Sequence, residues 1–311
     1  MKNKHNALPI MAGIVSSTIF GLSFMFSKIA LNEVGTFELL SFRFLIAFVI
    51  MTILIAFKVI KVNYKGKNLK GLFLLGLMEP VIYFIFETFG IKYSSSSLAG
   101  LMIALIPIFV IIMSAYFLRE KPSSVQILFI ILSVAGVMLI GIIGASDTQS
   151  SSIFGILLLL GAVLSAAAFS ILSRKLSNEF TSMELTYSMM LQAMVFFNGI
   201  SIVEHLIKGN IKTYFAPLRN TNFLISIGYL GILSSIVAYF LVNFTLSKLE
   251  ATKSSVVSNL ATIVSIIAGV LFFHETFELY HLAGSIMIIA GVWGTNYYEI
   301  KKVQLTQAEQ A

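Results

Sequence analysis

Continuous apolar runs of about 20 residues recur along the whole chain, with short polar connections between them. An α-helix of that length crosses roughly 30 Å of hydrocarbon, whereas a barrel strand would alternate apolar and polar positions. The pattern therefore predicts an all-α integral membrane fold with ten transmembrane helices. The predicted spans are Ile10–Leu31, Phe37–Phe57, Leu69–Ile91, Leu98–Leu118, Val125–Ile143, Ile153–Ser173, Leu185–Leu206, Phe223–Leu246, Ser254–Phe273 and His281–Tyr298.

The pattern also repeats after 155 positions, because Gly76–Val137 can be laid on Gly231–Val292 with Glu120 on Glu275. We interpret this register as an internal duplication. Five helices per repeat is an odd number, so the second repeat enters the membrane from the opposite face and the repeats have inverted topology. The expected units are a first repeat at 1–145 with helices 1–5, a second repeat at 150–299 with helices 6–10, and a polar, frayed cytoplasmic tail at 300–311.

Composition supports lipid as the solvent. Hydrophobic residues make up 58% of the 311 residues, charged residues 11%, and the mean hydropathy is +0.94. A soluble domain of this length does not hide so much apolar side chain. There is no cysteine and no GxxxxGK[ST] phosphate-binding loop, which excludes disulfides, a cysteine nucleophile and ATP hydrolysis by such a loop. We expect no cofactor and no metal.

The basic residues are distributed asymmetrically. Connections on one side of the predicted membrane hold fifteen of the 21 Lys and Arg residues, those on the other side hold four, and Lys28 and Arg43 lie inside spans. By the positive-inside rule, both termini face the cytoplasm of a multi-pass cell-membrane protein. The net charge of +7 therefore reflects membrane orientation, and no nucleic-acid partner is expected. The basic segment 1–6 precedes a run too long for a signal-peptide core, so we expect an uncleaved first helix.

Several short motifs carry a family resemblance over essentially the whole chain. They are Phe20–Phe24 with Lys28, Ser41–Phe44, Tyr93–Ser95, Ala104–Phe109, Leu118–Lys121, Leu249–Thr252 and Phe272–Glu275. With these motifs the chain resembles the EamA-type transporters of the drug/metabolite transporter superfamily. The resemblance implies a ten-helix inverted repeat, a central pathway, and secondary transport that is usually export of small metabolites or drugs. The family pattern has a proline where this chain has Thr262, and often an acidic residue where it has Ala261, so an acidic coupling role there is in doubt.

Glu79 is the strongest candidate site residue. It lies near the middle of the third span and is followed by Pro80, which removes a backbone donor and frees a carbonyl one turn back. Irregular backbone at that depth is tolerated only beside protein or water. We expect Glu79 to face a central cavity, where it binds a cationic substrate group or exchanges a proton. The structural alternative is a protonated carboxyl that is hydrogen-bonded between helices. Pro80 and Pro107 are the predicted helix breaks.

Charges inside other spans suggest a second grouping. Lys28, Arg43 and Glu87 all lie towards the outer ends of their spans, and charges in lipid need partners. We expect an outer ion network in which Glu87 neutralises one cation. The alternatives are a pair that locks helices one to three, or snorkelling of Lys28 to the interface.

Small polar residues mark one face of two spans. On the ninth span they follow helical spacing, and on the first span they lie beside Phe20. They line a cavity or let helices pack closely, and Asn259 is favoured for binding because an amide both donates and accepts. Tyr83 and Tyr239 offer aromatic walls with hydroxyl groups, or ordinary packing. The predicted cavity residues are Glu79, Tyr83, Ser23, Tyr239, Ser258, Asn259 and Thr262.

These observations predict a secondary transporter in the lipid bilayer, a monomer or homodimer, whose substrate is a small molecule. Export of an amino acid, a nucleobase-like compound or a cationic drug by alternating access is the main hypothesis, with protons as a candidate coupling ion. One alternative is import of a small cationic metabolite by the same fold. Others are a polytopic membrane enzyme, for which the clustered acidic or histidine residues are missing, and a non-transporting channel or scaffold.

Overall fold

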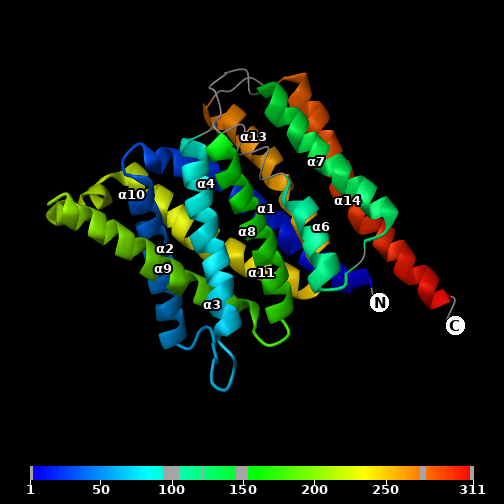
Figure 1. Ribbon diagram of the computed structural model, residues 1–311, viewed down its shortest axis with the longest axis horizontal. Helices are drawn as coiled ribbons and strands as arrows, with labels where there is room; N and C mark the ends of the chain where they lie inside the picture. The colour runs from blue at the N-terminus through cyan, green and yellow to red at the C-terminus, as the bar shows by residue number, and fades with distance from the viewer. Residues whose placement is uncertain (1–2, 94–104, 121, 145–152, 274–277, 309–311) are drawn as a thin grey trace.

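The computed structural model of the protein describes residues 3–93, 105–120, 122–144, 153–273 and 278–308 (Figure 1). Every regular element within these ranges is helical. Seven helical stretches there are long and apolar enough to cross a membrane, and three shorter apolar helices complete a set of ten. The predicted ten-helix membrane fold is confirmed.

The helices begin and end close to the limits of the apolar runs, because the polar connections between those runs belong to the membrane surface. The first repeat consists of α1 (Asn3–Leu31), α2 (Thr36–Ala56), α3 (Lys70–Gly76), η1 (Leu77–Ile82), α4 (Tyr83–Lys92), α6 (Ile106–Phe117) and α7 (Ser124–Gly144). The second repeat consists of α8 (Ile153–Leu176), α9 (Ser182–Ile207), η2 (Ile211–Thr213), η3 (Ala216–Arg219), α10 (Thr221–Gly228), η4 (Tyr229–Ala238), α11 (Tyr239–Lys248), α12 (Ala251–Ser258), α13 (Leu260–Phe273) and α14 (Leu279–Ala308).

The C-terminal segment corrects one expectation. The polar residues after Tyr298 were expected to fray, but α14 continues as a helix to Ala308. Glu, Lys, Gln, Leu and Ala dominate this segment and are all good helix formers, so the helix propagates beyond its apolar part. Polarity alone was therefore a poor guide to where the helix ends.

The two repeats interlock through their first helices. Helix α1 packs against η4, α11, α12 and α13 of the second repeat, whereas α8 packs against α3, η1, α4 and α6 of the first. Helix α2 likewise packs against α9 and η4. The first helix of each repeat thus packs mainly against the other repeat. These two helices, α1 and α8, lie in the middle of the bundle (Figure 1).

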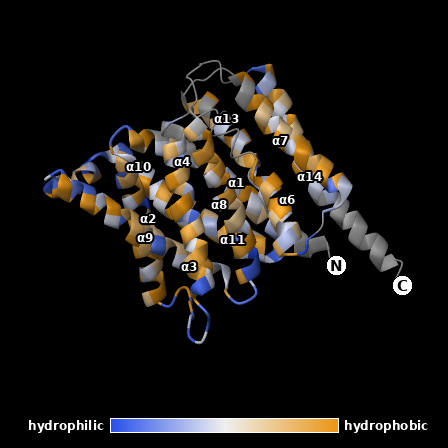
Figure 2. Ribbon diagram, in the orientation of Figure 1, coloured by the Kyte–Doolittle hydropathy of each residue, from blue (hydrophilic) through white to orange (hydrophobic). Residues whose placement is uncertain are grey.

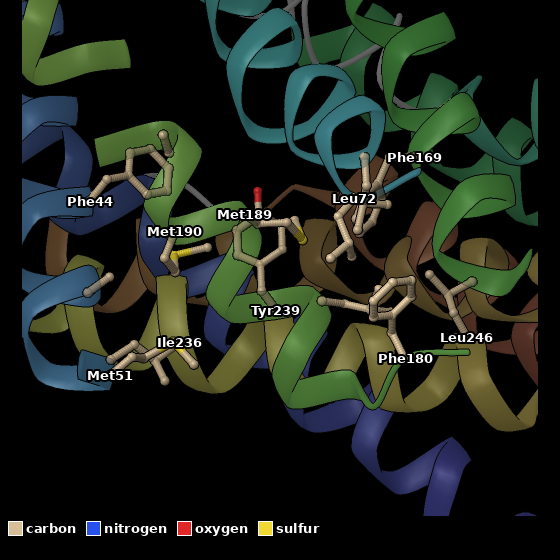
Figure 3. Close-up of a cluster of buried hydrophobic side chains, with 14 of the residues drawn as sticks. Phe44, Met51, Leu72, Phe169, Phe180, Met189, Met190, Ile236, Tyr239 and Leu246 are labelled. Atoms are coloured by element: carbon tan, nitrogen blue, oxygen red, sulfur yellow. The ribbon is translucent and has the colours of Figure 1, made fainter. Parts of the chain in front are cut away.

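The main apolar core lies in this middle region. It joins side chains of α2, α3, α8, α9, η4 and α11, with Phe44, Leu72, Met189 and Tyr239 among its buried members (Figure 3). Burial of side chains of this size contributes about 1.5–3 kcal/mol each in water. In lipid the same contacts act through close packing.

Hydrophobic residues cover the lengths of the helices, and hydrophilic residues gather on connections such as the loop after α2 (Figure 2). That loop carries Lys58, Lys61, Lys65 and Lys67. We call the end of the bundle that holds it the basic end. The start of α1 and the end of α14 lie towards the same side (Figure 1).

Helices α7 and α14 form a pair at one edge of the bundle (Figure 1). Gly136 of α7 meets Gly284 of α14, and a Cβ atom on either residue would lie 2.6 Å from the carbonyl oxygen of the other. Only glycine permits this approach, which resembles the small-residue contacts of many membrane helices.

Candidate functional site

A cavity of about 580 Å³ lies between the two repeats. Its walls come from α1, α2, η1, α4 and α6 of the first repeat, and from α8, η4, α11, α12 and α13 of the second. Its polar and charged lining includes the following residues: Ser23, Arg43, Glu79, Tyr83, Glu87, Ser234, Tyr239, Ser258, Asn259 and Thr262. A cavity at the repeat interface is the place where inverted-repeat transporters bind their substrates.

Two irregular segments face this cavity from opposite repeats. The third span of the first repeat is kinked within η1, and its counterpart in the second repeat is π-helical over η4. Under the 155-residue shift, residues 77–82 correspond to 232–237, so both repeats depart from the α-helix at the same position. Segments of π-helix occur frequently at functional sites because they re-aim side chains and free backbone groups.

Glu79 lies at the irregular point of η1. Its φ and ψ of −140° and 123° are extended rather than helical, and the next residue is Pro80. The carbonyl of Met78 accepts a hydrogen bond of 2.6 Å from the Ser165 hydroxyl on α8. The other repeat therefore satisfies backbone that the helix break leaves open, as buried polar groups require.

The Glu79 carboxylate crosses to the second repeat. Its Oε1 accepts a hydrogen bond of 2.9 Å from the Tyr239 hydroxyl. The Tyr239 ring is buried and meets Phe20 and Phe169 edge-on, with ring centroids 5.4 and 6.3 Å away. These aromatic contacts hold the Tyr239 hydroxyl in place. The hydrogen bond to Glu79 therefore connects the third span, in the first repeat, with the eighth span, in the second repeat.

Glu87 lies two turns further along the same wall. Its Oε1 accepts a hydrogen bond of 3.0 Å from the Tyr83 hydroxyl one turn earlier in α4. Both carboxylates on the cavity wall therefore have a tyrosine as their hydrogen-bond partner. Among the described residues, neither carboxylate accepts a hydrogen bond from another side chain.

Among the described residues that line the cavity, Arg43 of α2 is the cation. Its Nε donates to the Ser235 hydroxyl at 2.7 Å, and its Nη2 donates to the Ser234 hydroxyl at 2.9 Å. The Ser23 hydroxyl of α1 also donates to Ser234, at 2.9 Å. Ser234 and Ser235 occupy the positions in η4 that Glu79 and Pro80 occupy in η1.

The ninth span is interrupted beside the cavity. Helix α12 ends at Ser258 and α13 begins at Leu260, with Asn259 between them. The Asn259 side-chain amide donates to the Ser133 hydroxyl of α7 at 3.1 Å. Ser258 and Thr262 line the cavity on either side of this interruption.

The structure brings together all seven predicted cavity residues, and it also places Arg43 and Glu87 on the same walls. No carboxylate oxygen of the described residues lies within 4.0 Å of an Arg43 nitrogen, so Arg43 and Glu87 share a cavity without direct contact. The side chain of Lys28 lies outside the described part of the structure. The outer ion network therefore stays a prediction. Pro107 lies in the first turn of α6, which begins at Ile106 after the N-cap residue Leu105.

Three participants were missed from the sequence. Ser165, Ser234 and Ser235 were treated as ordinary span residues, because nothing in the local pattern separates a docking serine from a packing serine. The duplication held a usable signal, since Ser234 and Ser235 align with Glu79 and Pro80.

A second hollow of about 630 Å³ lies on the surface near Glu38, His205 and Arg219. Its lining comes from Glu33 and Glu38 of the first repeat and from residues 205–220 of the second, and it includes none of the predicted cavity residues. We therefore take the central cavity, which all of those residues line, as the candidate site. Within the described residues no group of three or more His, Cys, Asp or Glu side chains is arranged to hold a metal ion.

The sequence profile of the EamA-like transporter family matches the chain twice, over residues 7–142 and 153–297. The "Uncharacterized transporter YcxC" of Bacillus subtilis is 43% identical over 302 residues, which cover 97% of each chain. An "Uncharacterized transporter" of Archaeoglobus fulgidus is 30% identical over 276 residues, covering 89% of this chain and 94% of the relative.

One solved structure, titled "Crystal structure of protein", superposes with a TM-score of 0.76 at 13% identity. The match covers 94% of this chain and 99% of the other. At that level of identity the likeness shows a shared fold, and it says nothing about substrate.

Proposed function

Because the chain belongs to the EamA-like transporter family, we propose that it is a secondary active transporter that exports a small, amine-bearing metabolite by alternating access in exchange for protons. Amino acids, nucleobase-like compounds and cationic drugs are the candidate substrates. The single observation that carries this proposal is the position of Glu79. An acidic side chain on a broken helix lines a cavity between inverted repeats and is bonded to Tyr239 of the opposite repeat.

The proposed coupling follows from the chemistry of a carboxyl group in this place. A carboxylate attracts either a substrate ammonium or a proton, and occupancy by one excludes the other. Exchange then results, because the substrate leaves Glu79 on one side of the membrane and a proton takes its place. Loss of the bond to Tyr239 would let the two repeats move relative to each other.

The proposed orientation puts the basic end in the cytoplasm. The loop after α2 carries lysines at that end, and the start of α1 and the end of α14 lie towards it. Lys- and Arg-rich connections face the cytoplasm in most multi-pass proteins. Export then begins with loading of the cavity from the basic end.

The first experiment identifies a ligand. Purified protein is screened by thermal shift against amino acids, nucleosides, polyamines and quaternary amines, and each hit is tested for counterflow in proteoliposomes. We expect saturable counterflow, which requires a carrier with alternating access. Flux that does not saturate and shows no counterflow would instead indicate a channel.

The second experiment tests Glu79. Gln has nearly the shape of a protonated Glu and cannot release a proton, so Glu79→Gln should abolish acceleration of flux by an imposed pH gradient. Glu204→Gln removes an exposed carboxylate outside the cavity, so it is the control that should keep that acceleration. Equal pH dependence in wild type and Glu79→Gln would refute proton exchange at this residue.

A further inference from the structure

The buried guanidinium of Arg43 has one edge occupied and one edge open. Nε and Nη2 form the edge that donates to Ser235 and Ser234. A guanidinium presents five N–H donors in a rigid fork, so the parallel donors of Nη1 and Nη2 form a second edge. That second edge makes no hydrogen bond to any described residue, although the side chain lines the cavity.

Burial makes this open edge unusual. Arg43 is 5% exposed, and no carboxylate of the described residues pairs with it directly. The rings of Phe84 and Phe44, 5.1 and 5.3 Å from the guanidinium carbon, compensate only part of the cost of burying a cation. Buried charges normally have an anionic or fully hydrogen-bonded partner.

The nearby carboxylates are directed elsewhere. Glu79 accepts from Tyr239, and Glu87 accepts from Tyr83. Two tyrosines thus hold the acidic groups, while two serines of the opposite repeat hold the guanidinium. Within the described part of the cavity, the guanidinium edge and the carboxylates therefore lie apart and form no ion pair with one another.

We propose that the open edge of Arg43 binds a carboxylate of the substrate through two parallel hydrogen bonds, so that the substrate is a zwitterion with its amine on the acidic wall. This inference rests on the proposed function, which assigns the amine to Glu79. Planar, two-point recognition of a carboxylate is what a guanidinium fork provides and a lysine ammonium does not. Arg43 is then a specificity-determining residue, and Ser234 and Ser235 are positioning residues that orient its fork.

A zwitterion with one carboxylate and one ammonium group fits this cavity better than a phosphate or a carboxylic acid without an amine. Among the described lining residues, a phosphate dianion would meet one cation and two acidic side chains, so repulsion would dominate. A carboxylic acid without an amine would leave Glu79 and Glu87 without a cationic partner among these residues. A compound with one carboxylate and one ammonium satisfies both walls.

The test compares ligands that differ in one charged group. Leucine is measured against 3-methylbutylamine, which lacks the carboxylate, and 4-methylpentanoate, which lacks the amine. The pairs histidine with histamine and lysine with cadaverine extend the series in size. Binding is followed by thermal shift in detergent, and transport by counterflow in proteoliposomes.

For wild type we expect at least one amino acid to bind about 10-fold or more tightly than its amine. Arg43→Lys keeps the positive charge and removes the guanidinium fork. It should therefore weaken binding of that amino acid by about 10- to 100-fold and change the affinity for the amine by no more than about twofold. Arg219→Lys, at an exposed position outside the cavity, is the matched control and should change neither. Equal losses for the amino acid and the amine, or a wild-type preference for amines, would overturn the proposal.

Should Arg43→Lys fail to fold, Ser235→Ala provides the second variant. It removes one of the two hydrogen bonds that orient the fork, so it should lower amino-acid affinity several-fold without changing amine affinity. An unchanged ratio would overturn the assignment. Failure of the proposed function would give a different result. In that case proteoliposomes with the wild-type protein would show no counterflow of any compound, amines included.

Discussion

Glu120, just beyond the end of α6, accepts a hydrogen bond of 3.2 Å from Nε of Arg174 near the end of α8. The same carboxylate accepts from the backbone N–H of Ala251 at the start of α12, and Nη1 of Arg174 donates to the carbonyls of Leu246 and Ser247. One ion pair at the basic end thus ties together four spans from both repeats. We call this group the basic-end tie.

The basic-end tie should depend more on Arg174 than on Glu120. Removing the cation in Arg174→Gln leaves a largely buried carboxylate uncompensated, whereas Glu120→Gln leaves a neutral acceptor. Because both side chains are partly solvated, we expect Arg174→Gln to lower the free energy of unfolding by about 1–3 kcal/mol and Glu120→Gln to lower it less. Thermal unfolding in detergent measures both. A larger loss in Glu120→Gln would contradict this order.

The same pair should give a pH dependence of stability. Burial raises the pKa of the Glu120 carboxyl, and the hydrogen bonds from Arg174 and Ala251 oppose that rise only in part. A raised pKa in the folded state means that the folded protein favours protonated Glu120. The stabilisation from this protonation is complete below the unfolded-state pKa of about 4.3 and is lost as the pH rises through the folded-state pKa. Loss of Arg174 raises the folded pKa further. Stability of Arg174→Gln should therefore fall more steeply than wild type above about pH 4.3, and a parallel pH profile would exclude this explanation.

Tyr239→Phe tests the bridge to Glu79 without disturbing the aromatic packing. The substitution keeps the ring against Phe20 and Phe169 and removes only the hydroxyl that donates to Glu79. Leaving the buried acceptor without this partner should cost about 1–3 kcal/mol. Tyr83→Phe is the matched control, because its hydroxyl serves Glu87 on the same repeat. If the bridge couples the repeats, Tyr239→Phe should alter the rate of counterflow and Tyr83→Phe should not.

Gly136→Ala should weaken the α7–α14 pair. The added Cβ would lie 2.6 Å from the carbonyl oxygen of Gly284, which is backbone and cannot rotate away. Overpacking of this kind costs about 1–3 kcal/mol. Gly199→Ala in α9 is the control, because nothing lies within 4 Å of its added Cβ, and it should be neutral or stabilising by up to about 1 kcal/mol. Similar melting temperatures for the two variants would show that the close contact is not formed.

Glu184 should anchor the lysine-rich loop after α2. Its buried carboxylate accepts from Lys67 and from the backbone N–H groups of Asn63 and Thr181, each at 2.8 Å. Glu184→Ala should lower the free energy of unfolding by about 1.5–3 kcal/mol. It should also accelerate trypsin cleavage after exposed lysines of the loop. Glu204→Ala removes an exposed ion pair with Lys208 and should cost about 0.5 kcal/mol or less. An unchanged cleavage rate in Glu184→Ala would count against the anchoring role.

The spans and the inverted duplication were predictable because lipid imposes a simple length rule on apolar runs. The cavity-facing position of Glu79 was also a reasonable prediction, since a carboxyl followed by proline in mid-span is tolerated in few places. The helical state of residues 300–308 was not predicted, because polarity was taken as a sign of fraying although the residues favour helix.

The partners of Arg43 could not be read from the sequence for a different reason. Ser234 and Ser235 lie about 190 residues away along the chain, and their contact with Arg43 depends on how two repeats pack. Local periodicity places a residue on a helix face but does not reveal which distant helix that face meets. The interruption at Asn259 was hidden in the same way, since neither glycine nor proline marks it.

Fusion of the two halves into one polypeptide released them from having to be identical. In an assembly of two equal subunits, any change at the irregular turn of the third helix would appear on both walls at once, and a carboxylate would always face a second carboxylate. Here one copy has Glu79 and Pro80 while the other has Ser234 and Ser235 on the corresponding backbone. Both copies are irregular at the same place in the third helix, although in different ways. Divergence of the two copies gives the pathway one side that carries the acid and one side that binds Arg43 of the other repeat.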